Sequence, residues 1–326
     1  YNLVTPANAT FCGATTVSNS FAPNGVINTT GDIDFTGTVT CGTGSINATG
    51  GTVTYSNAVS NILPGTYNNL TISNGVTATM CAGTTNVTGT LSLEGATLNM
   101  NGSTLSAATV TRINTNAINI GTGTFTVNSS LSLTASDPVT FTGSGFLNVS
   151  GDLSCGALTG NAGTITLTGA FTPNAFTANT STVVFNGSGP QTIPAFNYYN
   201  LTSNSTGDRT LSGTGTVGIA GTFTPGTNSY TITGSTVDYN GTTSQTAAAF
   251  NYHNLTVSGS DVKTLSGAIT VDNDLSITGS AELASDVYQI TGNGTGIFSL
   301  GAGTTLSLGN TGDPTEVLFP LNYTSI

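Results

Sequence analysis

The chain has 326 residues, of which 3 are basic and 14 acidic, and only 5% of its residues are charged. Binding to a nucleic-acid backbone needs clustered Lys and Arg side chains, and Arg112, Arg209 and Lys263 are scattered, so nucleic acid is excluded as a partner. No apolar run approaches the ~18 residues that span a bilayer, which predicts no membrane insertion. A hydrophobic content of 37% predicts a folded chain rather than a linker.

Short segments that alternate apolar side chains with Thr, Ser or Gly recur along the chain. A period of two indicates strands with one buried face, and the Gly, Asn, Pro and Ser clusters between the segments are typical of turns. No segment shows a sustained helical period. The sequence therefore predicts an all-β protein. The clearest strands, in chain order, are expected over 124–127 (TFTV), 131–134 (LSLT), 164–168 (TITLT), 216–219 (TVGI) and 275–278 (LSIT).

An internal repeat, with an offset of 54 in residue number, is clearest over 181–292. The segment 181–187 (STVVFNG) recurs as 235–241 (STVDYNG), and 196–202 (FNYYNLT) recurs as 250–256 (FNYHNLT). A propeller would need a closed ring of matching blades, and an immunoglobulin-type array a buried Trp, which this chain lacks. A solenoid accommodates imperfect repeats of short strands. We therefore predict a single elongated parallel β-helix, with coils of roughly 18–27 residues as whole fractions of the repeat.

Three segments follow from this pattern. Residues 1–50 are expected to form N-terminal coils and a cap, and 51–310 the repeat-bearing β-solenoid. Residues 311–326 are expected to cap the last coil or to pair with another subunit.

The runs 67–71 (YNNLT), 196–202 and 250–256, each followed by a TLSG- or TNVTG-like stretch, carry a family resemblance. They resemble the repeats of secreted bacterial surface proteins of the parallel β-helix type, such as filamentous haemagglutinin, autotransporter passengers and the adhesins of gliding Bacteroidetes. The resemblance implies a right-handed β-helix at the cell surface, used for adhesion or as a scaffold.

The scarcity of charge suits a stack of coils, because like charges would repel at every ~4.8 Å step. Natural β proteins also protect open sheet edges with Lys or Pro, and this chain has 3 basic residues in all. We therefore expect the ends either to be capped by the chain's own apolar termini or to pair with another copy by strand addition. The candidate self-association residues are Tyr1, Leu3, Val4, Val317, Leu318, Phe319, Leu321, Tyr323 and Ile326.

The four cysteines, Cys12, Cys41, Cys81 and Cys155, form no CxxC pair and have no His companions, so a zinc site is not expected. A disulfide requires Cα atoms within ~7 Å. That limit favours a Cys12–Cys41 bridge, the alternative being that all four remain small buried hydrophobes. A bridge would fit a secreted chain in an oxidising compartment.

No residue constellation predicts catalysis. The nearest carboxylate pairs, Asp32 with Asp34 and Asp272 with Asp274, have no base nearby in the sequence, whereas glycoside hydrolysis needs two carboxyl groups tuned in opposite directions. We expect no cofactor, and at most a weak Ca²⁺ site at Asp272 and Asp274. A polysaccharide lyase or hydrolase is a minor alternative.

Several rare residues share repeated columns. Arg209 aligns with Lys263 and His253 with Tyr199, which favours structural or surface positions for them. The Asn-Xaa-Ser/Thr positions Asn69, Asn200 and Asn254 also share a column, which is either an Asn ladder or a row of glycans. In the FNY motifs we expect the Phe and one Tyr of each repeat to pack in the core.

Two functions are consistent with these features. The first is a non-enzymatic extracellular structural subunit, which self-associates end to end or by strand donation into a filament, sheath or matrix fibre. The alternative is an adhesin stalk or surface module that binds carbohydrate.

Overall fold

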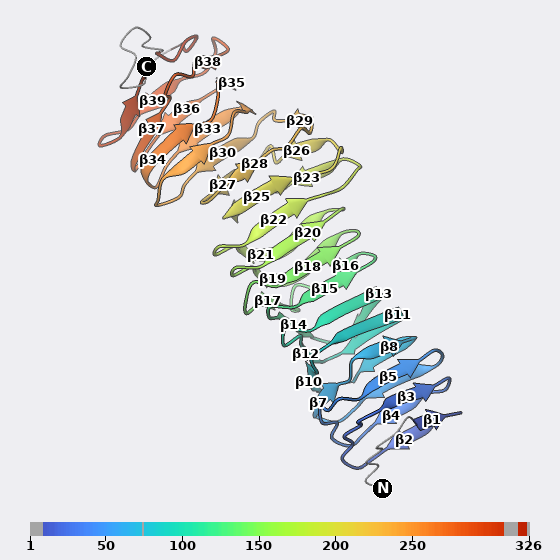
Figure 1. Cartoon of the computed structure of the whole chain (residues 1–326). Coiled ribbons are helices and arrows are strands. Elements are labelled where there is room, and N and C mark those ends of the chain that lie inside the picture. Colours follow the sequence, from blue (N-terminus) through green and yellow to red (C-terminus); the bar gives the residue numbers. More distant parts are fainter. Residues whose placement is uncertain (1–8, 74, 310–318, 325–326) are drawn as a thin grey trace. The chain divides into compact units, whose positions relative to one another are not determined.

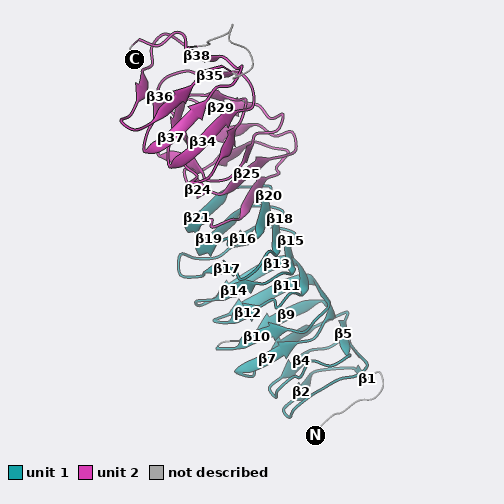
Figure 2. Ribbon diagram, turned by 60° about the vertical axis from the view of Figure 1, so that its left-hand side comes forward, with its two compact units in different colours: residues 1–177 teal, residues 178–326 magenta. Residues whose placement is uncertain are grey.

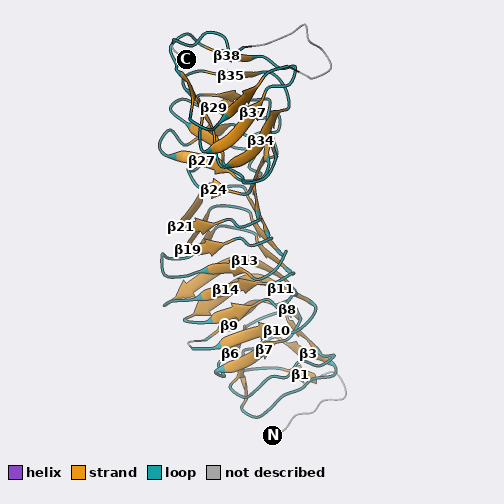
Figure 3. Ribbon diagram, turned by 90° about the vertical axis from the view of Figure 1, so that its left-hand side faces the viewer, coloured by secondary structure: helices purple, strands orange, loops and turns teal. Residues whose placement is uncertain are grey.

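The computed structural model describes residues 9–73, 75–309 and 319–324 (Figure 1). About 53% of the chain is in strands, the sheets are all parallel, and the described residues contain no helix (Figure 3). The chain forms two compact units, residues 1–177 and 178–326 (Figure 2). Each unit winds as a parallel β-solenoid, and the two units together have about 15 turns. The predicted all-β parallel β-helix is therefore confirmed.

Unit 1 (residues 1–177) has three walls of stacked strands. The long strand β11 belongs to both the first and the second wall, and its pairing with β13 shifts register between Val87 and Thr90. The first wall contains β1 (Ala9–Phe11), β3 (Val26–Thr29), β5 (Ser45–Ala48), β8 (Gly65–Tyr67), β11 (Thr84–Glu94), β13 (Thr104–Ile113), β15 (Thr124–Val127), β18 (Phe146–Val149) and β20 (Thr164–Leu167). The second contains β2 (Thr15–Val17), β4 (Ile33–Phe35), β6 (Thr52–Tyr55) and β9 (Asn69–Ile72), and leads into β11. The third contains β7 (Val59–Ile62), β10 (Thr77–Met80), β12 (Thr97–Asn99), β14 (Ala117–Ile120), β17 (Val139–Phe141), β19 (Leu153–Thr159), β21 (Phe171–Thr177) and the short β16 (Leu131–Ser132).

Each coil of unit 1 takes about twenty residues. Ala9 pairs with Ile27 of the next coil, and Thr124 pairs in the same way with Phe146. Along most strands of unit 1 the apolar side chains point inward and the Thr, Ser and Asn side chains outward, as the period of two predicts. The core is consequently a column of stacked apolar side chains.

Unit 2 (residues 178–326) is built from the same kind of coil. Its sheets comprise β22 (Thr182–Phe185), β25 (Asn200–Ser203) and β28 (Phe223–Thr224); β23 (Gln191–Ile193), β26 (Arg209–Leu211) and β29 (Tyr230–Thr231); and β24 (Asn197–Tyr198), β27 (Thr216–Ile219), β30 (Thr236–Tyr239), β33 (Asn254–Val257), β36 (Leu275–Ile277) and β39 (Phe298–Leu300). The remaining sheets comprise β31 (Gln245–Ala247), β34 (Ser260–Leu265), β37 (Ser280–Ala284) and β40 (Thr305–Ser307), and β32 (Asn251–Tyr252), β35 (Ile269–Val271) and β38 (Ile290–Gly292).

The sequence repeat is not a whole number of coils, which corrects the sequence expectation. Successive coils differ in length, since Thr182 pairs with Asn200 whereas Leu201, the residue that follows Asn200, pairs with Phe223. The first strand of the repeat, β22, pairs with β25, whereas its copy β30 pairs with β27 and β33 in a different sheet. Equivalent residues of the two copies therefore do not stack on each other.

The FNY motifs contribute one Tyr each to the core, as expected, whereas the Phe of each motif is only half-buried. Tyr198 and Tyr252 are buried, and their hydroxyl groups donate hydrogen bonds to the carbonyl oxygens of Pro194 (2.9 Å) and Ala248 (2.8 Å). The buried hydroxyl groups thus keep hydrogen-bond partners inside an apolar core.

Candidate functional site

The C-terminal end of unit 2 presents open strand edges. Strand β39 pairs only with β36 and β40 only with β37, so within the described residues their outer edges have no partner strand. Large apolar side chains are exposed at this end: Ile297 is 48% and Leu300 49% accessible. Unpaired edges with exposed apolar side chains are a template for another chain. We call Ile297, Leu300 and the outer edges of β39 and β40 the C-terminal edge.

Part of this end is covered by the chain itself. Leu321 forms a parallel bridge with Thr291 beside β38, and its backbone N–H donates to the carbonyl oxygen of Ile290 (3.1 Å). The rings of Phe319 and Tyr323 lie about 6 Å from that of Phe298. Residues 319–324 therefore cover β38 and the residues that lead into β39, because the backbone N–H of Thr324 also donates to the carbonyl oxygen of Gly296 (2.9 Å). Among the described residues, the side chains of Ile297 and Leu300 remain exposed.

The candidate self-association residues Val317, Leu318 and Ile326 lie outside the described residues, as do Tyr1, Leu3 and Val4.

The N-terminal end of unit 1 also presents open edges. Strand β1 pairs only with β3, and β2 only with β4, among the described residues. Phe11 on β1 and Val17 on β2 are only half-buried, whereas Phe35, one coil further into the stack, is fully buried. Within the part of the chain that the structure describes, no layer therefore covers the first coil.

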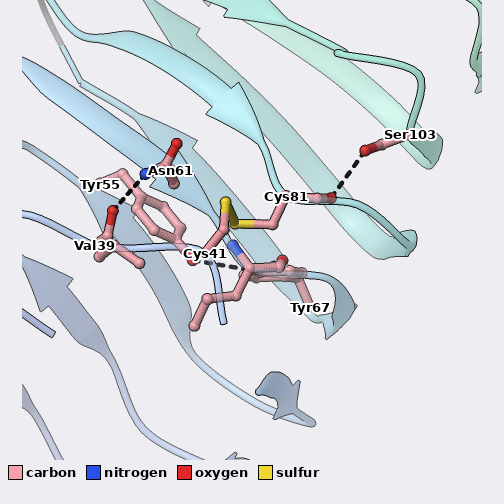
Figure 4. Close-up of a disulfide and its surroundings, with 8 residues drawn as sticks. Val39, Cys41, Tyr55, Asn61, Tyr67, Cys81 and Ser103 are labelled. Atoms are coloured by element: carbon pink, nitrogen blue, oxygen red, sulfur yellow. Dashed lines mark hydrogen bonds between the residues drawn. A yellow bond between two sulfur atoms is a disulfide. The ribbon is translucent and has the colours of Figure 1, made fainter. Parts of the chain in front are cut away.

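The disulfide joins Cys41 to Cys81 (Figure 4), so the Cys12–Cys41 prediction is wrong. The Cα atoms of the bridged pair are 5.4 Å apart. Cys12 is a free exposed thiol and Cys155 a free buried one. The reason lies in the coil length. The bridged pair is 40 residues apart, close to two whole coils, which returns the chain to the same corner. Cys12 and Cys41 are separated by about one and a half coils, which ends on another side of the stack.

The disulfide lies at a corner that is also closed by hydrogen bonds (Figure 4). The hydroxyl groups of Tyr55 and Tyr67 are 2.9 Å apart, and Ser103 Oγ donates to the carbonyl oxygen of Cys81 (2.8 Å). Burial raises the pKa of Tyr55 to about 12, so this pair stays protonated at neutral pH. The bridge thus reinforces a packed corner of unit 1.

Arg209 and Lys263 are both fully buried in unit 2, and their repeated column is structural. Each is paired with a buried Gln on the neighbouring strand: Gln191 pairs with Arg209, and Gln245 pairs with Lys263. Burial lowers the pKa of both cations, against the opposing effect of nearby acidic groups. The Arg209 guanidinium donates to the carbonyl oxygens of Phe185, Gly187, Gly189, Asn204, Gly207 and Asp208. Lys263 Nζ donates to the carbonyl oxygens of Gly241, Thr243, Ser260 and Asp261. These cations supply hydrogen bonds to backbone carbonyl groups at corners of the coil. They are therefore not surface groups.

A buried carboxylate forms a second polar corner, in unit 1. Asp137 accepts hydrogen bonds from the backbone N–H groups of Asn116 (2.7 Å) and Thr134 (2.8 Å) and from the Thr134 hydroxyl (2.7 Å). Arg112 Nε lies 3.5 Å from the carboxylate. Burial opposes ionisation of Asp137, but these hydrogen bonds and the Arg112 charge outweigh it and lower its pKa. Burial, with the Asp137 charge, raises the pKa of the nearby Cys155 thiol to about 12, which makes it unreactive.

The calcium candidates do not gather a ligand set. No group of three or more His, Cys, Asp or Glu side chains that could hold a metal ion occurs among the described residues. Asp274 instead accepts a hydrogen bond from the backbone N–H of Ile297 (2.9 Å). The bond ties Asp274 to the next coil.

The Asn column consists of residues that bridge neighbouring coils. Asn69 Oδ1 accepts from the N–H of Thr90 (2.9 Å), and Asn200 Oδ1 accepts from that of Thr222 (3.0 Å). Asn254 Oδ1 accepts from the side-chain amide of Asn273 (2.8 Å). Asn200 and Asn254 lie in different sheets and do not stack on each other, so the predicted ladder of these residues is not formed. Glycosylation at Asn69, Asn200 and Asn254 stays a prediction.

Comparison with known proteins adds no family. No protein-family model matches the chain, and searches of curated proteins and of solved structures find no similar protein. None of the described residues form a helix of the length and apolarity needed to cross a membrane.

Proposed function

We propose that the protein is a non-enzymatic extracellular structural subunit that associates end to end into a filament, sheath or matrix fibre. The observation that carries the proposal is the C-terminal edge, where β39 and β40 have no partner strand on their outer sides among the described residues and Ile297 and Leu300 are exposed. An open sheet edge can be completed by a strand of another chain or by a cover. A second copy can supply such a strand from its own first coil.

The direction of the strands makes this contact head to tail. The open edges at the N-terminal end belong to β1 and β2, and those at the C-terminal end to β39 and β40. Stacking the first coil of one copy on the last coil of another would continue the parallel ladder. Such a heterologous contact does not close on itself unless the rotation allows a ring, so it generates a filament.

A secreted setting and a cell-surface scaffold are part of the proposal. The Cys41–Cys81 bridge supports them, because disulfides persist mainly in oxidising compartments. The low charge of the chain supports a uniform stack of coils in a polymer. The adhesin and autotransporter type suggested by the repeat motifs is the corresponding finer proposal.

Replacing Leu300 with Lys should prevent assembly. Leu300 lies on β39 and is 49% exposed, and a Lys on an open edge opposes pairing with another strand. We expect regular fibres from the wild-type protein in negative-stain electron microscopy and dispersed particles from Leu300→Lys at the same concentration.

The matched control is Phe146→Lys. Phe146 is 46% exposed on β18, a strand paired on both sides by β15 and β20. This variant should still form fibres. Wild-type protein that stays monomeric by sedimentation velocity, or Leu300→Lys fibres indistinguishable from wild type, would contradict the proposal.

A deletion distinguishes edge stacking from strand donation. Removing residues 317–326 should leave soluble monomers if this segment completes a neighbouring subunit. Because residues 319–324 cover β38 in their own chain, we expect fibres to persist after the deletion. Their loss, with the circular dichroism spectrum unchanged, would favour donation.

A further inference from the structure

Two adjoining hollows form one groove on the surface of unit 2, which we call the Tyr199 groove. The first, of about 280 Å³, is lined by Tyr199, Gly221, Thr222, Thr243, Ser244 and Thr246, among others. The second, of about 380 Å³, shares Thr222 and Thr246 and extends to Pro225, Ala249 and Ser266. The two hollows adjoin at the shared residues Thr222 and Thr246.

We propose that the Tyr199 groove binds an extended neutral oligosaccharide. Its lining contains hydroxyl and amide groups and an aromatic ring, and no charged side chain. Sugar rings have apolar C–H faces that pack on aromatic rings and hydroxyl groups that hydrogen-bond to Thr, Ser and amide groups. An anionic chain fits poorly, since the protein carries a net charge of −11 and the two cations of unit 2, Arg209 and Lys263, are buried.

Tyr199 is the residue of the FNYYN motif that remains available. Its neighbour Tyr198 is buried with its hydroxyl bonded to Pro194. Tyr199 stands at the bend between β24 and β25, where it lines the groove and is half-buried. The Tyr199 ring is therefore accessible, while the neighbouring Tyr198 is anchored in the core.

Gly221 gives the ring its place. A Cβ atom at Gly221 would lie 2.9 Å from the Tyr199 ring and 2.6 Å from Asn200 Oδ1. Asn200 cannot move aside freely, because Oδ1 accepts from the N–H of Thr222 (3.0 Å) and Nδ2 donates to Thr182 Oγ1 (3.2 Å). The ring thus lies against bare backbone in a preorganised position, which reduces the entropy lost on binding.

The second repeat copy lacks this combination. His253 takes the place of Tyr199. The carbonyl oxygen of Tyr199 accepts a hydrogen bond from the N–H of Gly221, whereas that of His253 accepts one from the N–H of Asn273. The pair of an aromatic ring and a glycine is therefore specific to the first copy. His253 offers a matched control position in the same chain.

The groove favours a flat, extended chain of sugars. It crosses successive coils rather than ending in a closed pocket, and a flat chain presents its ring faces along its whole length. A coiled chain would touch the groove at only one or two sugars.

The test is titration calorimetry of the full chain with cellohexaose, with hexagalacturonate as the charged comparator. We expect 1:1 binding of cellohexaose and weaker binding of hexagalacturonate. Tyr199→Ala should lower the affinity for cellohexaose at least tenfold, and His253→Ala should leave it unchanged. Thr246→Val, which removes an exposed hydroxyl at nearly constant volume, should lower it several-fold while the unfolding temperature stays the same.

Three results would overturn the proposal: no cellohexaose binding by the wild type, equal binding by Tyr199→Ala, or tighter binding of hexagalacturonate. If Tyr199→Ala fails to fold, the Thr246→Val titration decides, and unchanged affinity there counts against the groove. Leu300→Lys should bind cellohexaose as the wild type does, because the groove does not include the C-terminal edge. This outcome separates the groove from the proposed assembly.

Discussion

Replacing Arg209 with Met is expected to lower the free energy of unfolding by roughly 3–5 kcal/mol. The side chain is fully buried, and its guanidinium donates to six backbone carbonyl groups at one corner of unit 2. Met replaces the aliphatic stem of Arg but has no guanidinium group, so several buried acceptors would lose their partners. Each orphaned group costs on the order of 1–3 kcal/mol, although water entering the corner would recover part of that loss.

The conservative variant Arg209→Lys separates loss of the donors from loss of volume. Lys supplies three donors, and Lys263 fills the equivalent column of the second copy with bonds to the same kind of carbonyl group. We expect it to retain most of the stability. Urea unfolding followed by hydrogen exchange should place the Arg209→Met effect in unit 2; an unchanged urea midpoint would show that the corner does not need a cation.

The fold class could be predicted from the sequence because a solenoid repeats one local rule. Segments such as 124–127 (TFTV) bury alternate residues as the period of two requires. The coil length was not predictable from the repeat. The repeat unit spans more than two coils but fewer than three, since its first strand β22 and the copy β30 lie in different sheets. The error in pairing Cys12 with Cys41 follows directly, because disulfide reach depends on coil length.

The candidate sites were predictable only in part. The alignment of Arg209 with Lys263 identified a repeated sequence position. The hydrogen-bond partners of both side chains are backbone carbonyl groups, which any residue type carries, so the sequence does not reveal them. Open ends were expected from the scarcity of charge, whereas the exposure of Ile297 and Leu300 depends on the stack ending there. For the Tyr199 groove, the sequence showed two neighbouring tyrosines without showing which one faces out.

Asp137→Asn is the second change with a large expected effect, about 2–4 kcal/mol at pH 7. The fully buried carboxylate accepts from two backbone N–H groups and a hydroxyl, and lies beside Arg112. Asn keeps one acceptor oxygen and turns an NH₂ group toward donors that already point inward. It also leaves Arg112 without its countercharge. The effect should appear in unit 1, in urea unfolding monitored by hydrogen exchange.

The pH dependence of stability tests the charge itself. The pKa of Asp137 is lowered in the folded chain, so the carboxylate contributes stability above its unfolded value, about 3.9. That contribution is lost as the pH falls through the lower folded pKa. The wild type should therefore lose urea resistance more steeply than Asp137→Asn below about pH 4, and the two midpoints should converge. Parallel curves for the two proteins down to the most acidic pH would mean that Asp137 is not ionised in the folded state.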